Sequence, residues 1–236
     1  MTLLSMTKIL FSFILISLIA SGTVKAGVFR VNADLESSRF LRGIDITDGQ
    51  PALSLSVDWS SDTGLFSGAN CYRSDSQQGA SLSNGCQFYL GYFKALNNNQ
   101  AISFALNGSD YVRTADPQWD YLEATIDWNL NKETVISFGF SDDWFGRGFK
   151  SINIDAKKRF VLNDQFSISS SVGLLAFESD APISSLPLLE LGLNYAKNRW
   201  NIGLSSSWTS SDVQQLTPQF STNQPEFQLS VSYRLY

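Results

Sequence analysis

The feature that most constrains the fold is an alternation of apolar and polar residues with a period of two. In residues 53–59 every odd position is apolar and every even position is polar. The stretches 122–128, 189–195 and 200–205 repeat this pattern. Successive side chains of a β-strand point to opposite faces, so each stretch forms a strand with one apolar and one polar face. No segment after residue 26 shows a sustained helical period, and the sequence predicts an all-β fold.

We expect twelve strands, joined by connections that are short and long in strict alternation. The predicted strands cover residues 29–41, 52–60, 64–72, 86–95, 100–108, 119–130, 133–141, 151–158, 165–176, 187–196, 199–208 and 226–236. Short turns are expected near 61–63, 97–99, 131–132, 162–164 and 197–198, and longer polar loops near 42–51, 73–85, 109–118, 142–150, 177–186 and 209–225. The third strand has two almost equally apolar faces, and without it ten strands would remain. Short turns on one rim and long loops on the other are typical of outer-membrane barrels, in which the short turns are periplasmic and the long loops extracellular.

The composition favours a sheet that meets lipid. Charged residues make up 17% of the chain, below the roughly 25% of soluble domains, and aromatic residues make up 13%. Lipid offers no hydrogen-bond partner to a strand edge, so the sheet has to close into an antiparallel transmembrane β-barrel. Aromatic residues near the predicted periplasmic rim would form an interfacial girdle: Trp59, Tyr92, Phe93, Trp128, Tyr195, Trp200 and Tyr236. The alternative is a soluble β-sandwich with these rings in its core.

The first 26 residues have the pattern of a secretory signal peptide. Lys8 precedes an apolar run from residue 9 to residue 20, too short to span a bilayer as a helix. Val24 and Ala26 suit the −3 and −1 positions of a signal-peptidase site. We therefore expect residues 1–26 to be removed and residues 27–236 to form the barrel.

The last predicted strand, 226–236, is amphipathic and ends on the aromatic Tyr236. It resembles the signal read by the barrel-assembly machinery, a partner expected during insertion. In the usual pattern the terminal aromatic residue is in register with the apolar stripe, whereas here Leu235 occupies that register.

Residues 38–52 resemble the opening of the Gcw_chp-type proteins, proteobacterial outer-membrane proteins of similar length and uncharacterised function. Their pattern is approximately aromatic-x-x-Arg-Gly-x-Ser-x-Ser/Thr, followed by a Pro before the second strand. Arg42, Gly43, Thr47 and Pro51 match it, whereas Asp45 replaces the usual Ser and Phe40 is displaced from the usual Tyr. The resemblance is specific in this short stretch; it implies a barrel and no particular activity.

Cysteine and histidine usage limits the chemistry. Cys71 and Cys86 bracket the second long loop, and in an exported chain a disulfide between them is the expected state. The chain contains no histidine, so Ser-His and Asp-His catalytic arrangements are excluded, and with two cysteines a zinc site is not expected. The loop carboxylates Asp142, Asp143, Asp45 and Asp48 are interpreted as solvating or cation-contacting groups. We expect no enzyme activity, cofactor or metal.

If the apolar stripes face lipid, the polar stripes face the lumen. The inward acids would be Asp34, Glu36, Asp58, Glu123, Asp127, Asp155 and Glu190, opposed by Arg30, Lys157 and Arg234. This excess of carboxylates favours cations, although the charges could instead pair and fill the lumen, since twelve strands lie between filled and open barrels. Two functions stay open for this protein of the bacterial outer membrane: a narrow cation-preferring channel or small-solute uptake barrel, and a non-conducting structural or surface-binding protein. Outer-membrane lipid and lipopolysaccharide are the expected surroundings, and the net charge of −5 argues against nucleic acid.

Overall fold

The computed structural model describes residues 27–42, 44–74, 84–112, 120–146, 148–178, 184–210 and 226–236. The predicted signal peptide, residues 1–26, lies outside the described residues. Twelve strands form the barrel: β1 (Val28–Glu36), β4 (Ala52–Ser60), β5 (Leu65–Ser74), β6 (Asn84–Ala95), β7 (Ala101–Val112), β8 (Tyr121–Asn129), β9 (Thr134–Ser141), β10 (Ser151–Val161), β11 (Phe166–Phe177), β12 (Ser185–Lys197), β13 (Trp200–Thr209) and β14 (Glu226–Arg234). Two short strands, β2 (Phe40–Leu41) and β3 (Ile44–Asp45), pair with each other, and a 3-10 turn, η1, covers Trp144–Gly146. No helix in this part of the chain is long and apolar enough to cross a membrane.

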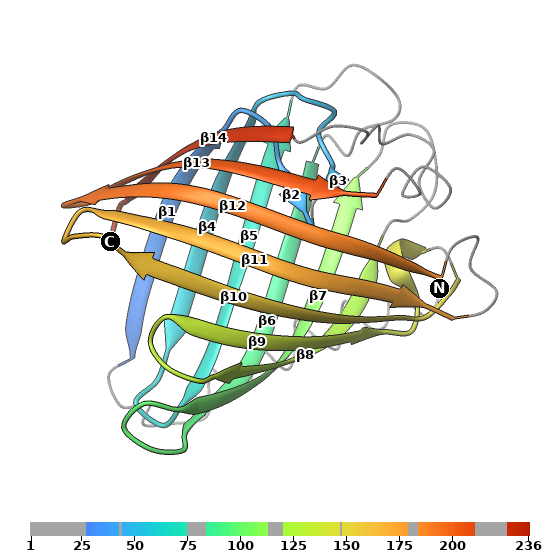
Figure 1. Ribbon diagram of the computed structural model, residues 1–236, viewed down its shortest axis with the longest axis horizontal. Helices are drawn as coiled ribbons and strands as arrows, with labels where there is room; N and C mark the ends of the chain where they lie inside the picture. The colour runs from blue at the N-terminus through green and yellow to red at the C-terminus, as the bar shows by residue number, and fades with distance from the viewer. Residues whose placement is uncertain are drawn as a thin grey trace.

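The barrel is an antiparallel meander that closes on itself. Each barrel strand pairs with the next along the chain, and β1 pairs with both β4 and β14. The short connections lie at one end, here called the short-turn end, and the strand ends that border the longer connections lie at the other, the long-loop end (Figure 1). The predicted closed barrel of twelve strands is confirmed, including the doubtful third strand, which is β5.

The first predicted strand, 29–41, is too long. β1 ends at Glu36, opposite Ala52 of β4, and Phe40 and Leu41 belong instead to the β2–β3 hairpin. The apolar pair Phe40 and Leu41 extends the predicted strand, although Ser37 and Arg39 already break the alternation after Leu35. The chain nevertheless turns into the barrel, since Ile44 and Ile46 are almost fully buried there.

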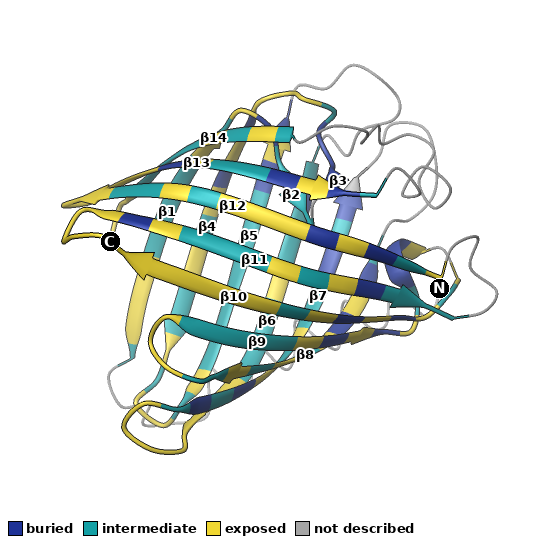
Figure 2. Ribbon diagram, in the orientation of Figure 1, coloured by how far each residue is buried: buried dark blue, intermediate teal, exposed yellow. Residues whose placement is uncertain are grey.

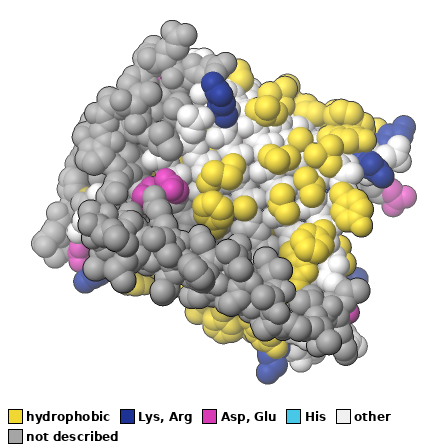
Figure 3. Space-filling model, turned by 180° about the vertical axis from the view of Figure 1, so that it is seen from behind, with side chains coloured by type: hydrophobic (Ala, Val, Ile, Leu, Met, Phe, Trp, Pro, Cys, Tyr) yellow, Lys and Arg dark blue, Asp and Glu magenta, His cyan; other side chains and the backbone are white. Residues whose placement is uncertain are grey.

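The outer surface carries the apolar stripes. The alternating residues of β4 behave as predicted: Leu53 and Leu55 are at least half exposed, whereas Ser54 is buried. Figure 3 shows apolar side chains spread over the visible outer wall. Lipid rather than water suits such a surface.

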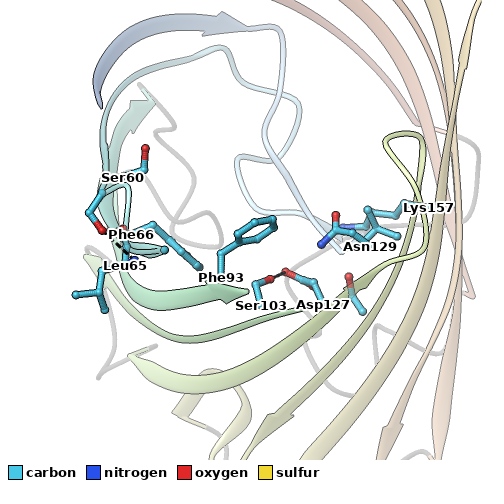
Figure 4. Close-up of a pocket in the computed structure, with 12 residues that line it drawn as sticks. Ser60, Leu65, Phe66, Phe93, Ser103, Asp127, Asn129 and Lys157 are labelled. Carbon is cyan, nitrogen blue, oxygen red and sulfur yellow. Dashed lines mark hydrogen bonds between the residues drawn. The ribbon is translucent and has the colours of Figure 1, made fainter. Parts of the chain in front are cut away.

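The predicted aromatic girdle needs one correction. Trp59, Trp128, Tyr195 and Trp200 occupy outward positions near the short-turn end, paired with outward residues of neighbouring strands. Phe93 instead points into the barrel (Figure 4), because it lies an even number of positions from the inward Tyr89. Two neighbouring aromatic residues of one strand cannot both face lipid.

The predicted disulfide between Cys71 and Cys86 is present. The two residues lie directly opposite each other on β5 and β6, with their Cα atoms 4.1 Å apart. They share the outward face with Leu55, which pairs with Cys71. The bond ties together the two strands that flank the second long loop.

Candidate functional site

The candidate site is the lumen, where the structure places all the acids and bases proposed for it. On β4, Asp58 lies opposite Arg30 of β1 and accepts a hydrogen bond from the hydroxyl of Tyr89. On β8, Asp127 lies between Ser103 and Ser137 of the neighbouring strands, and the Ser103 hydroxyl donates to it at 3.2 Å. The remaining inward charged residues of the strands are Asp34, Glu36, Glu123, Asp155, Lys157, Glu190 and Arg234, together with Arg159 and Glu226, which the sequence reading missed although both lie on inward positions of the alternation.

The lumen is closed at its long-loop end. There, lumen-facing residues are buried on each strand from β4 to β13: Ala52, Ser54, Tyr72, Gly85, Ser109, Tyr111, Tyr121, Glu123, Ser141, Ser151, Asn153, Leu175, Leu186, Leu188, Ser207 and Thr209. Toward the short-turn end, Lys157, Arg159 and Glu190 are exposed. In Figure 2 the dark segments of β12 lie near its long-loop end, in agreement with the burial of Leu186 and Leu188. Side chains therefore fill the long-loop half of the barrel. In the short-turn half the charged side chains are exposed, although small wall residues such as Ala101, Ser103 and Ser167 are buried there as well.

The closure consists of a cluster of apolar side chains, here called the apolar plug. Strand ends contribute Ala52, Tyr72, Tyr111, Tyr121, Leu175, Leu186 and Leu188, and the loops contribute Ile44, Ile46, Trp144 and Phe145. The four loop residues are each about 1% exposed, as deeply buried as Leu175 and Leu186 of the strand ends. Two long loops thus fold inward and pack against the wall, which alternation within the strands does not predict.

The first of these loops, residues 37–51, is here called the lumen hairpin. Inside it, Ile46 N donates to Arg39 O at 2.9 Å, and Arg39 N donates to the hydroxyl of Thr47 at 2.9 Å. Asp45 accepts hydrogen bonds from the backbone N–H groups of Thr47 and Gly49, at 2.8 and 2.6 Å. Burial raises the pKa of the Asp45 carboxyl, while these hydrogen bonds act in the opposite direction.

Two arginines hold the lumen hairpin to the wall. The Arg39 guanidinium donates to Glu36 at 3.0 Å and to Asn70 at 2.6 Å, and lies 4.6 Å from the centroid of the Tyr72 ring. Arg42 forms an ion pair with Glu123 of β8. Following the barrel round, β8 is separated from β1 by four strands on one side and six on the other, so the hairpin reaches almost across the lumen.

The second inward loop, residues 142–150, is anchored by aromatic contacts. The Phe145 ring centroid lies 5.0 Å from that of Tyr121 and 5.8 Å from that of Tyr111. Trp144 contacts Phe177 edge-on, at 5.1 Å between centroids. Phe145 has a left-handed backbone (φ 52°, ψ 33°), which costs energy for a residue with a Cβ. Burial of the ring offsets this strain.

Below the plug, at the short-turn end, lies a cavity of about 630 Å³, here called the vestibule. Its walls consist of Ser60, Ser61, Gly64, Leu65, Phe66, Phe93, Ser103, Asp127, Asn129, Val135, Ser137 and Lys157. Phe66 and Phe93 stand on one side, and Asp127, Asn129 and Lys157 on the other (Figure 4). The cavity therefore combines an aromatic wall with charges of both signs.

Two glycines allow Phe66 and Phe93, here called the aromatic wall, to occupy their positions in the vestibule. A Cβ on Gly91 would meet the Phe66 ring, so the missing side chain lets that ring lie across β6. Gly64 has φ 95° and turns back against Phe93, whose N–H donates to Gly64 O at 2.8 Å. The turn at Gly64 and the absence of a side chain at Gly91 of β6 thereby keep both rings in the vestibule.

The residues of the family-like stretch all lie in or next to the lumen hairpin. Arg42 makes the ion pair with Glu123, Thr47 is fully buried, and Pro51 is exposed immediately before β4. Gly43 lies outside the described residues, as does Arg147 of the second inward loop. A short polar stretch with two isoleucines spaced two apart was the only sequence signal for the hairpin. Among the residues that the structure describes, no group of three or more potential metal-ligating side chains comes together.

Comparison with solved structures places the fold among outer-membrane porins. The KdgM porin matches with a TM-score of 0.56 at 10% sequence identity, covering 89% of this chain and 100% of the porin. The NanC porin matches with a TM-score of 0.56 at 10% identity, over 87% of this chain and 98% of the porin. A second KdgM structure, a complex with disordered oligogalacturonate, has a TM-score of 0.53 at 9% identity over 89% and 100%. No protein-family model and no curated protein matches the sequence. At these identities the likeness shows the fold.

Proposed function

We propose that this protein is a narrow channel for small solutes in the bacterial outer membrane, mildly selective for cations, with the lumen hairpin as its movable obstruction. The observation that carries the proposal is the polar, water-accessible half-lumen, which runs from the vestibule to the hairpin inside an apolar outer wall. In outer-membrane barrels the short turns lie on the periplasmic side. We therefore infer that the vestibule opens to the periplasm and that the apolar plug lies on the extracellular side. Displacement of the hairpin would connect the periplasm with the extracellular side through the lumen.

Charge supports the preference for cations. The inward acids of the strands and the hairpin are Asp34, Glu36, Asp45, Asp48, Asp58, Glu123, Asp127, Asp155, Glu190 and Glu226; the inward bases are Arg30, Arg39, Arg42, Lys157, Arg159 and Arg234. Arg39 and Arg42 pair with Glu36 and Glu123, and among the inward groups left the acids outnumber the bases. Galacturonate chains carry a carboxylate on each sugar, so the acidic excess favours a different class of solute here from that of the KdgM complex.

The register allows a clean test of the obstruction. β1 and β4 are paired up to Glu36 and Ala52, so residues 37–51 can be replaced by an Asn-Gly turn that closes a two-residue hairpin. In planar bilayers we expect the parent protein to show small or rare current steps, and the variant without the hairpin to conduct steadily. Persistent silence of both proteins, each shown to be folded, would contradict the channel.

The selectivity is tested on acids that face the open half of the lumen. Asp127→Asn with Glu190→Gln should move the reversal potential under a low-salt gradient toward zero, because screening is weakest there. Asp164→Asn, in an exposed short turn, is the matched control and should leave the potential unchanged. An equal response of the two variants would remove these carboxylates from the ion path.

The alternative is a non-conducting structural or surface-binding barrel. It is favoured by the tight packing of the plug, in which Trp144, Phe145, Ile44 and Ile46 are almost fully buried. In that case removal of the hairpin would lower stability without producing current.

We also propose how the chain is processed and in which membrane it resides. Cleavage after Ala26, assembly by the barrel-assembly machinery and surroundings of outer-membrane lipid and lipopolysaccharide remain predictions, as does membership of the Gcw_chp-type family. The porin fold supports a non-enzymatic role. N-terminal sequencing of the protein from outer-membrane fractions tests the cleavage site and the location together.

A further inference from the structure

The aromatic wall of the vestibule is not required by the barrel. Phe93 is 43% exposed although it points into the lumen. Its neighbour Tyr92 is 44% exposed, but it lies on the outer face of the barrel. Phe66 lies two residues after Gly64 and lines the same cavity as Phe93. An aromatic surface left open in a polar cavity is the usual lining of a small-molecule site, where a few charged groups set the orientation of the ligand.

The opposite wall offers one charge of each sign. Lys157 makes no ion pair with any residue that the structure describes, although Asp127, Asp155 and Glu190 also face the lumen around it. Asp155 accepts a hydrogen bond from Asn153 at 2.9 Å. From the residues that the structure describes, Asp127 accepts one hydrogen bond, donated by Ser103, and so retains acceptor capacity. An ammonium and a carboxylate are thus both available to a bound solute.

The spacing of these groups limits the size of the solute. Phe93, Ser103 and Asp127 lie in one cross-strand row, so Phe93 and Asp127 are two strands, or about 10 Å, apart. Lys157 lies in the next row, opposite Val135, which places its backbone about 12 Å from that of Asp127. The lysine side chain spans much of this distance. What remains fits two opposite charges carried close together on one small molecule.

We propose that the vestibule binds a small zwitterion with an apolar side chain, of the class of free apolar amino acids. Its ammonium group pairs with Asp127, its carboxylate with Lys157, and its side chain packs against Phe66 and Phe93. This inference names the solute of the proposed channel and rests on that function in so far as solute enters from bulk water. A simple cation would be repelled by Lys157, and a simple anion would be repelled by Asp127.

The test measures binding rather than current. Equilibrium dialysis of labelled L-phenylalanine against the mature, refolded protein in detergent micelles gives the Kd, with protein-free micelles as the baseline for partitioning. We expect saturable binding at millimolar concentrations. Phenethylamine, which lacks the carboxylate, and 3-phenylpropionate, which lacks the ammonium, should each bind about tenfold or more weakly, the effect of losing one charged hydrogen bond. Glycine, which lacks the ring, should not bind measurably.

Neighbouring residues on the same strands provide matched controls. Lys157→Met should abolish the preference for L-phenylalanine over phenethylamine, whereas Lys158→Met, one residue further and facing outward, should retain it. Phe93→Ala should weaken binding of L-phenylalanine, and Tyr92→Ala should not. Absence of saturable binding by the parent protein, or equal effects of Lys157→Met and Lys158→Met, would overturn the inference. Binding without current would contradict the channel and leave the site standing; current without binding would do the reverse.

Discussion

Loss of the Arg42–Glu123 ion pair is the most direct perturbation of the closed lumen. The side chains of Arg42 and Glu123 are 18% and 8% exposed, so Arg42→Met leaves a nearly buried carboxylate without its cation. Removal of one partner of a buried pair costs about 3 kcal/mol at the lower end of measured effects, which corresponds to a factor of roughly 100 in an equilibrium. We expect the hairpin to leave its closed position about a hundredfold more often, because the ion pair that holds it there is lost.

Single-channel recording in planar bilayers measures this change as open probability. Arg42→Met should raise the open probability steeply, and Glu123→Gln should raise it less, because the amide oxygen still accepts a hydrogen bond from the partly hydrated Arg42. The double variant with Arg42→Met and Glu123→Leu should return to the closed behaviour of the parent, since no buried charge is left uncompensated. This order of effects follows from burial of the pair.

An exposed ion pair serves as the control. Lys150 and Glu178 lie 3.8 Å apart with side chains 60% and 33% exposed, so Lys150→Met should cost at most about 1 kcal/mol and leave the open probability unchanged. A folded Arg42→Met protein that stays as closed as the parent would refute the reasoning. An equal opening in the double variant would show that the hairpin is held by its apolar contacts instead.

Three further predictions concern stability, measured as the urea midpoint of unfolding. Replacement of Cys71 and Cys86 by Ala should cost up to about 3 kcal/mol, because the bond closes a loop with a sequence separation of 15, and reduction of the parent should give the same loss; an unshifted midpoint would contradict this. Phe145→Ala should cost about 3–5 kcal/mol through loss of the buried ring, and Phe145→Gly should be about 1 kcal/mol less harmful because glycine tolerates φ 52°; the opposite order would disprove the strain. Gly91→Ala should cost about 1–3 kcal/mol, because its Cβ would meet the Phe66 ring and the Phe104 carbonyl, whereas Gly108→Ala, with open space around its Cβ, should be near neutral. Equal effects of the two glycine changes would argue against the packing of Phe66.

The barrel itself was predictable because its determinants are local. A two-residue period assigns each side chain of a strand to lipid or lumen, and the alternation of short and long connections orders the strands into a meander. Asp58, Asp127 and Glu190 could therefore be placed inward before any pairing was known. The same logic should have placed Phe93 inward, since it lies next to the outward Tyr92. The prediction that Phe93 belongs to the girdle is wrong because alternation, and not position near a rim, decides which face a side chain occupies.

The sequence alone thus determined the class of fold, the faces of the strands and the opposition of the two cysteines. Tertiary structure decided whether the lumen is open. The sequence of a loop does not show whether the loop folds into the lumen. That depends on which apolar surfaces the closed barrel wall presents to it. Arg42 finds Glu123 81 residues away, and Ile44 and Phe145 enter one cluster from different loops, only once the barrel has brought them together. The plug and the vestibule beneath it arise from this long-range packing, whereas each strand face follows from the next residue along the chain.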